Sequence, residues 1–120
     1  MPAGRLESNN YATSHLGMKQ AYARAIPGAW RRIARVFVAL GDEHRQRILL
    51  MFEPGERLNV GQIVAASTLS RSAVAHHLRV LREAGVLKSE KVGKEVQFWP
   101  DAPAVQAALA AVQDYLASHR

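Results

Sequence analysis

Residues 60–84 predict two short amphipathic helices joined by a brief turn, and this segment constrains the fold more than any other. The first helix is expected over VGQIVAAS, residues 60–67, where apolar side chains recur at helical spacing. The turn TLS follows, Ser70 can cap the second helix with its hydroxyl oxygen, and Gly85 ends that helix. Two helices with so short a connection match the helix-turn-helix layout.

The second helix, within SRSAVAHHLRVLREAG, separates apolar from polar side chains. At about 100° per residue, one face is apolar and expected in the core, and it consists of Val74, Leu78 and Leu81. The opposite face presents a hydroxyl, an imidazole, a guanidinium and a small residue, from Ser72, His76, Arg79 and Ala75. Such side chains suit base edges and phosphates in a DNA major groove. An ordinary solvated helix face is the alternative.

The adjacent histidines of this helix point in different directions. His76 falls on the polar face, whereas His77 sits at the border of the core face. Histidines that chelate one ion from a single helix are spaced by three or four residues, so this pair is not expected to share a metal. For His77 we expect a packed, hydrogen-bonded side chain rather than a ligand.

Two more helices are expected before this segment. The first begins at Ala29 and ends at Gly41. The second runs through EHRQRILLMF, residues 43–52, with Asp42 as its cap, and Pro54 and the glycine after it close it. Three apolar side chains of this second helix are expected to be buried, namely Ile48, Leu49 and Phe52.

After the helix-turn-helix the pattern changes to strands. VLKSEKVGKEVQFW, residues 86–99, predicts a two-stranded hairpin with a charged tip around Gly93. Asp101 then caps a last helix that carries Pro103 in its first turn. This last helix is apolar or alanine around most of its circumference, more than one small domain needs to cover, and a surplus apolar face usually marks a partner surface.

Length and composition limit the class of protein. The chain has 120 residues, which suits one domain over residues 29–120 after an arm of residues 1–28, with a candidate short helix at 16–26. It has no cysteine, which removes thiolate metal sites and cysteine nucleophiles. The formal charge of +6 is common in proteins that bind nucleic acid. No apolar run approaches the ~20 residues that span a bilayer, and a cytoplasmic chain without membrane contact is expected.

Three stretches within residues 33–99 together resemble the ArsR-type winged-helix repressors of bacteria. They are ALGDEHRQRIL, LSRSAVAHHLRVLREAGVL and KVGKEVQF. The resemblance implies a mainly α fold with a small β-hairpin, that is, a winged helix-turn-helix with an extended N-terminal arm. It also implies a homodimer that binds an inverted repeat in double-stranded DNA and leaves it when a signal arrives. The residues it places near DNA are Ser70, Arg71, Ser72, His76 and Arg79, with Lys91 and Lys94 at the wing tip.

The same resemblance implies an α-helical dimer interface built from the first and last helices. The apolar candidates for this interface are Trp30, Ile33, Phe37, Val105, Leu109, Val112 and Leu116.

The chain departs from its metal-sensing relatives at both of their usual sites. Asn59, Val60 and Gly61 stand where one group carries a Cys-x-Cys pair. A second group places histidines and carboxylates on the last helix, where this chain offers Asp101, Pro103, Asp114 and Ala117. Two carboxylates without imidazoles are a poor site for zinc or nickel, so neither metal nor cofactor is expected and the inducing signal is left open.

Three other functions are alternatives to a DNA-binding regulator. His15 and His119 could meet across a dimer and form a histidine-based metal sensor, although the ligands fall short of four. A winged-helix module for protein contact would not need the cations at the helix face and wing. An enzyme is not expected, because the chain lacks a Ser-His-Asp signature, a phosphate-binding glycine loop and a metal motif.

Overall fold

The computed structural model of the chain describes residues 26–120. Most of the expected arm, and nearly all of its candidate helix at 16–26, lies outside the described residues. Contacts divide the chain into two units, Met1–Arg32 and Ile33–Arg120, and the second unit holds every described element except the first turn of α1. Within residues 26–120, no helix is both long enough and apolar enough to cross a membrane.

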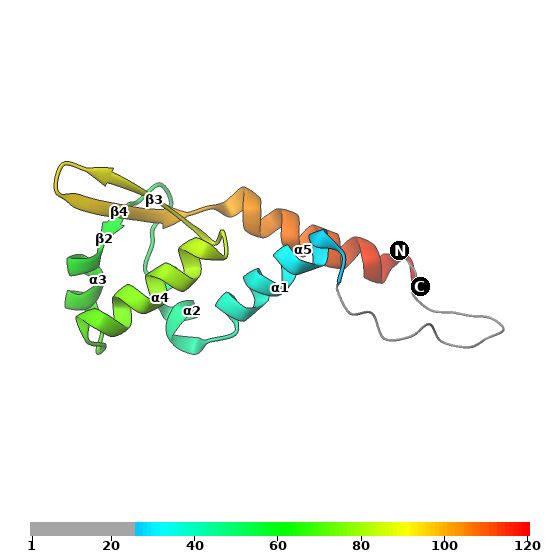
Figure 1. Cartoon of the computed structure of the whole chain (residues 1–120), viewed down its shortest axis with the longest axis horizontal. Helices are drawn as coiled ribbons and strands as arrows, with labels where there is room; N and C mark the ends of the chain where they lie inside the picture. The colour runs from blue at the N-terminus through cyan, green and yellow to red at the C-terminus, as the bar shows by residue number, and fades with distance from the viewer. Residues whose placement is uncertain (1–25) are drawn as a thin grey trace. The chain divides into compact units, whose positions relative to one another are not determined.

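Helices dominate the described residues, and a small sheet is formed by one strand before α3 and two strands after α4 (Figure 1). The elements in chain order are α1 Gly28–Leu40, α2 Glu43–Leu49, β2 Leu58–Asn59, α3 Val60–Ala66, α4 Arg71–Glu83, β3 Leu87–Val92, β4 Glu95–Pro100 and α5 Ala102–Ala117. This order confirms the expected winged helix-turn-helix.

The bounds of α4 agree with the sequence signals. The Ser70 hydroxyl oxygen accepts a hydrogen bond of 3.2 Å from the backbone N–H of Ala73, as an N-cap does. At the other end Gly85 has φ +82°, and the backbone N–H of Val86 reaches back to the carbonyl of Leu81 at 2.9 Å. This is the left-handed helix ending that favours glycine.

The core of residues 33–120 is built around α4, which packs against α2, α3 and β3. The expected apolar face of α4 is confirmed, since Val74, Leu78 and Leu81 are all buried. The other elements contribute Ile33, Val36, Ala39, Ile48, Leu58, Ile63, Val86, Leu87, Phe98 and Ala108.

The sheet has the strand order β2–β4–β3 and is antiparallel throughout. The β3–β4 hairpin, residues 87–100, is called the wing below. Its tip turns at Gly93, which has φ +64°. The sequence predicts only the hairpin, and the third strand, β2, whose Leu58 pairs with Phe98, was not predicted. A strand of two residues is too short to show an alternating pattern.

The expectation for α2 was wrong at its C-terminus. The helix ends at Leu49, not at residue 52, because beyond Leu50 the backbone N–H groups bond over three residues, Met51 to Ile48 and Phe52 to Leu49. Of the three side chains expected in the core, only Ile48 is buried, while Leu49 and Phe52 are half-buried. Leu50 is 82% exposed.

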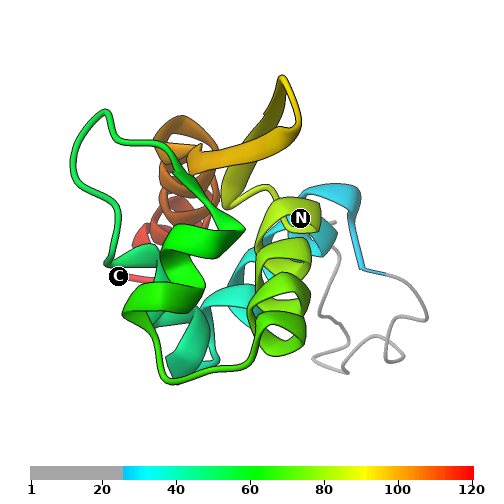
Figure 2. The same cartoon turned by 90° about the vertical axis from the view of Figure 1, so that its left-hand side faces the viewer.

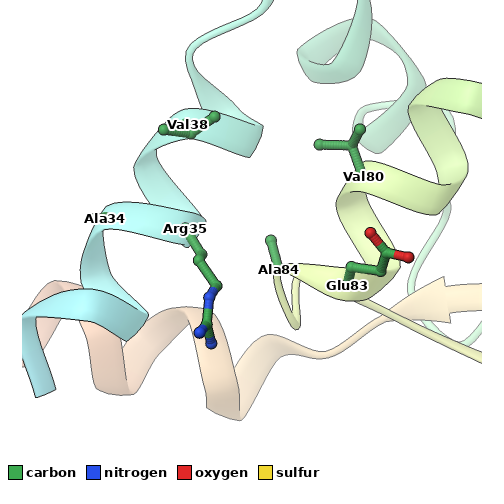
Figure 3. A pocket seen from close by; sticks show the side chains of 6 residues that line it. All are labelled: Ala34, Arg35, Val38, Val80, Glu83 and Ala84. Carbon is green, nitrogen blue, oxygen red and sulfur yellow. The ribbon is translucent and has the colours of Figure 1, made fainter. Parts of the chain in front are cut away.

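An open groove of about 390 Å³ lies between α1 and α4 (Figure 3). Arg35 and Val38 line it from α1, and Val80 and Glu83 line it from α4. The remaining lining residues are Ala34 and Ala84.

Candidate nucleic-acid interface

The polar face of α4 is exposed, as expected. Ser72, His76 and Arg79 are all accessible, while Ala75 between them is half-buried. Figure 2 looks onto α3 and α4 side by side, with the wing above them. Arg79 has no ion pair within residues 26–120, so its guanidinium is available for a phosphate or a base edge.

The first turn of α4 combines structural and accessible groups. Ser70 is exposed, but its hydroxyl already caps the helix and lies 3.2 Å from the hydroxyl of Ser72. Arg71 is exposed beside it and, like Arg79, forms no ion pair among the described residues. The helix N-terminus therefore presents an arginine and two hydroxyls, which are groups that contact phosphates in protein–DNA complexes.

The wing carries exposed lysines beside acidic residues that are already bound. Glu90 pairs with Arg57, and Glu95 accepts hydrogen bonds from Gln97 at 3.0 Å and Asn59 at 2.8 Å. These two bonds, the one from Gln97 first, lower the pKa of Glu95 below its usual range. Lys91 and Lys94 have no such partner in the described part of the chain, and neither does Lys88, so these lysines are uncompensated charges of the wing.

Arg57 was missed by the sequence analysis. Its guanidinium lies 3.8 Å from the centre of the Trp99 ring and also binds Glu90, so it covers the outer face of the wing. Lys88 is the cross-strand partner of Trp99 on that same face. No spacing in the sequence connects residue 57 with the hairpin, because the contact depends on how β2 pairs with β4.

Asn59 was also missed as a structural residue, although a local signal existed. Its side-chain oxygen accepts from the backbone N–H of Gln62 at 2.8 Å, and the Gln62 side chain accepts from the backbone N–H of Asn59 at 2.8 Å. This is a capping box at the start of α3, and the spacing Asn-x-x-Gln is its sequence signature.

The expectation for His77 is confirmed. The ring is half-buried, and its Nδ1 lies 3.2 Å from a guanidinium nitrogen of Arg45. Burial lowers the pKa of His77 below its usual 6.5, although the carboxylate of Asp42 acts in the opposite direction. The capping role of Asp42 is confirmed as well, since it accepts from the backbone N–H groups of His44 at 2.8 Å and Arg45 at 3.2 Å.

The candidate dimer residues differ in exposure. Phe37 is 45% exposed on α1, while Leu109 and Leu116 on α5 are 44% and 58% exposed. Val105 and Val112 are half-buried. Ile33 is buried within its own chain, so that residue offers little surface to a partner.

Residues 26–120 contain no group of three or more histidine, cysteine, aspartate or glutamate side chains that could hold a metal ion. Asp101 serves as the N-cap of α5, accepting from the backbone N–H of Ala104 at 3.3 Å. The ring of His119 lies against that of Tyr115, with centroids 4.6 Å apart. His15, the other candidate ligand, lies outside the described residues.

Comparison with known proteins connects this geometry to a family. Residues 42–89 match the family described as bacterial regulatory protein, arsR family. The arsenic resistance transcriptional regulator ArsR1 of Pseudomonas putida is 35% identical over 91 residues, which cover 66% of this chain and 71% of that protein. The chain belongs to the arsR family. The resemblance inferred from the sequence is thereby confirmed, and the class of the chain is transcription regulation rather than catalysis.

Other relatives agree with this membership. A transcriptional repressor SmtB homolog of Synechocystis is 37% identical over 68 residues, 57% of this chain, and the match spans only 51% of that relative. Among solved structures, an ArsR-like transcriptional regulator from Rhodococcus sp. RHA1 has a TM-score of 0.71 at 27% identity, covering 77% of this chain and 86% of that one. The repressor PagR of Bacillus anthracis gives 0.57 at 25% identity, covering 70% and 95% respectively.

Proposed function

We propose that this arsR-family chain is a transcriptional repressor that binds double-stranded DNA as a homodimer, with α4 in the major groove and the wing beside it. The observation that carries the proposal is the exposed face of α4. Ser72, His76 and Arg79 form a row of side chains one helical turn apart that can donate to base edges. The unpaired lysines of the wing extend the same basic surface, and the excess of cations favours counterion release from phosphates.

A homodimer is supported by the two sides of α5. Ala108 is buried against the rest of its own chain, whereas Leu109 and Leu116 lie on a neighbouring side of the helix and stay exposed. Phe37 on α1 adds a further exposed aromatic ring. Apolar side chains of this size on two helices favour a partner surface, and the two reading helices of a twofold dimer would fit an inverted repeat.

The signal that releases the proposed repressor cannot be a metal ion bound by cysteine thiolates. One relative is named for arsenic resistance and another for cadmium resistance, but this chain has no cysteine to bind such soft ions. We infer a signal that acts without thiolates, and its identity is left open.

The test begins with selection of bound DNA from a random pool, which yields the preferred site. Binding of that site and of random DNA is then measured by fluorescence anisotropy for His76→Ala, Arg79→Ala and Lys94→Ala. We expect the two α4 variants to lose about 1–3 kcal/mol on the selected site and much less on random DNA. Lys94→Ala should weaken both DNAs alike and reduce the salt slope by about 1.

A matched control is Arg47→Ala on α2, because Arg47 is an exposed arginine that is already paired with Glu43 over 3.1 Å and does not belong to α4 or the wing. This variant should bind both DNAs like the parent chain. Equal losses on both DNAs for all three test variants would contradict the assignment of the reading face, and selection that enriches no sequence would contradict specific binding altogether.

A further inference from the structure

Arg45 on α2 joins three helices through one guanidinium. Its Nε donates to the carbonyl of Ala39 at 2.8 Å and its Nη2 to that of Val38 at 3.1 Å, both near the end of α1. Its Nη1 meets Nδ1 of His77 on α4 at 3.2 Å. The Arg45 side chain is only 12% exposed, so these bonds are largely shielded from water.

The chemistry of this contact determines the protonation state of His77. A guanidinium has only donors, so Nδ1 of the imidazole must accept. The ring is therefore neutral and carries its proton on Nε2. Protonation of Nδ1 would place two N–H donors against each other and add a second positive charge beside Arg45, which removes the hydrogen bond.

His77 occupies a position from which it can control the orientation of α4. It is adjacent in sequence to His76 on the exposed face and to Leu78 in the core. A hydrogen bond at this border restrains rotation of α4 about its own axis, which the apolar contacts of its core face alone restrain less specifically. The direction in which His76 and Arg79 point depends on that rotation.

We propose that Arg45 and His77 are positioning residues for DNA reading: their hydrogen bond holds α4 against α1 and α2 in the orientation that reads bases, and only the neutral form of His77 supports it. The inference rests on the proposed function of α4. It predicts that sequence discrimination is lost on acidification while general attraction to DNA persists.

The charges around His77 come from α2, from α4 and from the turn before α2. Asp42 lies between α1 and α2, Arg45 and His44 lie on α2, and His76 lies on α4 itself. The His44 and His76 rings are 5.8 Å and 5.5 Å from the His77 ring. The packed helix α3 carries no titratable side chain, and β3 contributes none of the charges that act on His77. Burial disfavours the charged form of His77, and the positive charge of Arg45 repels it. Together these effects outweigh the attraction of Asp42, so the pKa is lowered and the ring is neutral near pH 7.

The experiment compares the affinity for selected DNA with the affinity for random DNA across pH, because acidification should change the two affinities in opposite directions. Acidification charges histidines and strengthens binding to any DNA, while the fraction of chain with neutral His77 falls. One pH unit below the His77 pKa about a tenth of the protein is neutral, so the ratio of specific to random affinity should fall about tenfold. Anisotropy titrations with the full chain between pH 7.5 and 4.5 measure this ratio, and circular dichroism confirms that the chain is folded at each pH.

The decisive variant is His77→Asn, whose side-chain oxygen takes the acceptor position of Nδ1 but does not titrate. We expect the ratio of specific to random affinity of this variant to stay high and nearly constant across this pH range. His44→Asn is the matched control, because it removes a neighbouring imidazole without touching the Arg45 bond, and it should show the same fall as the parent. His76→Asn separates any effect of the base-reading ring itself.

The result that would overturn the inference is a fall in the ratio for His77→Asn parallel to that of the parent. A second measurement needs no variant. The nitrogen chemical shifts of His77 in the free chain should show a neutral ring with the proton on Nε2. A proton on Nδ1 at pH 7.5 would overturn the inference. If the parent shows no sequence preference at pH 7.5, the proposed function fails, whereas the chemical shifts still decide whether the Arg45–His77 bond exists.

Discussion

The side-chain amide of Asn59 donates to the carboxylate of Glu95 over 2.8 Å. Asn59 caps α3, and Glu95 is the first residue of β4, so one side chain joins the helix-turn-helix to the wing. Because Lys94 directly precedes Glu95, the same bond helps to place the wing cation relative to the helices. The backbone pairing of β2 with β4 supports this arrangement.

Replacing Asn59 with alanine should lower the free energy of unfolding by about 1–2 kcal/mol, because the variant loses the cap of α3. The change is measured by urea denaturation. Asn59→Asp is the informative control, since its carboxylate can still cap the helix but repels Glu95. Amide hydrogen exchange in β4 should then be faster for both variants, and an Asn59→Ala chain as stable as the parent would contradict the role of the cap.

Asp42 should make stability depend on pH in the acid range. The backbone N–H of Arg45 is the largest influence on Asp42 and lowers its pKa in the folded chain below its usual 3.8. Burial, the second largest, raises the pKa, and the backbone N–H of His44 and the charges of Arg45 and His77 lower it further. The folded state therefore binds fewer protons than the unfolded state, so this contribution is fully present above the unfolded pKa and is lost as pH falls through the folded pKa.

Asp42→Asn keeps a capping side chain but does not titrate. Urea unfolding from pH 6 down to pH 2.5 should show the parent losing stability more steeply than this variant below about pH 4. The other carboxylates contribute to both chains alike, so the difference isolates Asp42. Parallel curves would show that the cap carries no pH dependence.

Leu109→Asp and Leu116→Asp should turn the proposed homodimer into monomers, because a carboxylate in an apolar interface is costly. Sedimentation equilibrium at micromolar concentration measures this. Ala107→Asp is the matched control, as Ala107 is exposed and about 160° around α5 from Leu109, and it should leave the dimer intact. A parent chain that is monomeric at this concentration would refute the interface.

Zinc, nickel or cobalt should not release the chain from DNA at physiological levels. Asn59 and Gly61 stand at the Cys-x-Cys position of metal-sensing relatives, and Asp101 is engaged as a cap. A gel-shift titration with buffered metal tests this. Release at submicromolar free zinc or nickel that His15→Ala or His119→Ala abolishes would establish a metal site formed by the arm and the C-terminus.

The sequence alone was sufficient for the helix-turn-helix and for the two faces of α4. Ser70 and Gly85 mark the helix ends through bonds to residues within one turn, and the spacing of Val74, Leu78 and Leu81 identifies the core side. Helix limits and burial patterns depend on neighbours three or four positions apart, which a single sequence displays directly. The exposed polar face of α4 followed from the same periodicity.

Only the tertiary structure decided which side chains join these elements. The Arg45–His77 contact links positions 32 residues apart, and Asn59–Glu95 links positions 36 apart. The strand β2 and the place of Arg57 over Trp99 likewise depend on pairing across the fold. Each of these contacts needs the chain already folded so that distant residues meet at a defined orientation, and no local spacing encodes such a meeting. The sequence could therefore show that His77 is packed, but not that its partner is an arginine whose donors require a neutral ring.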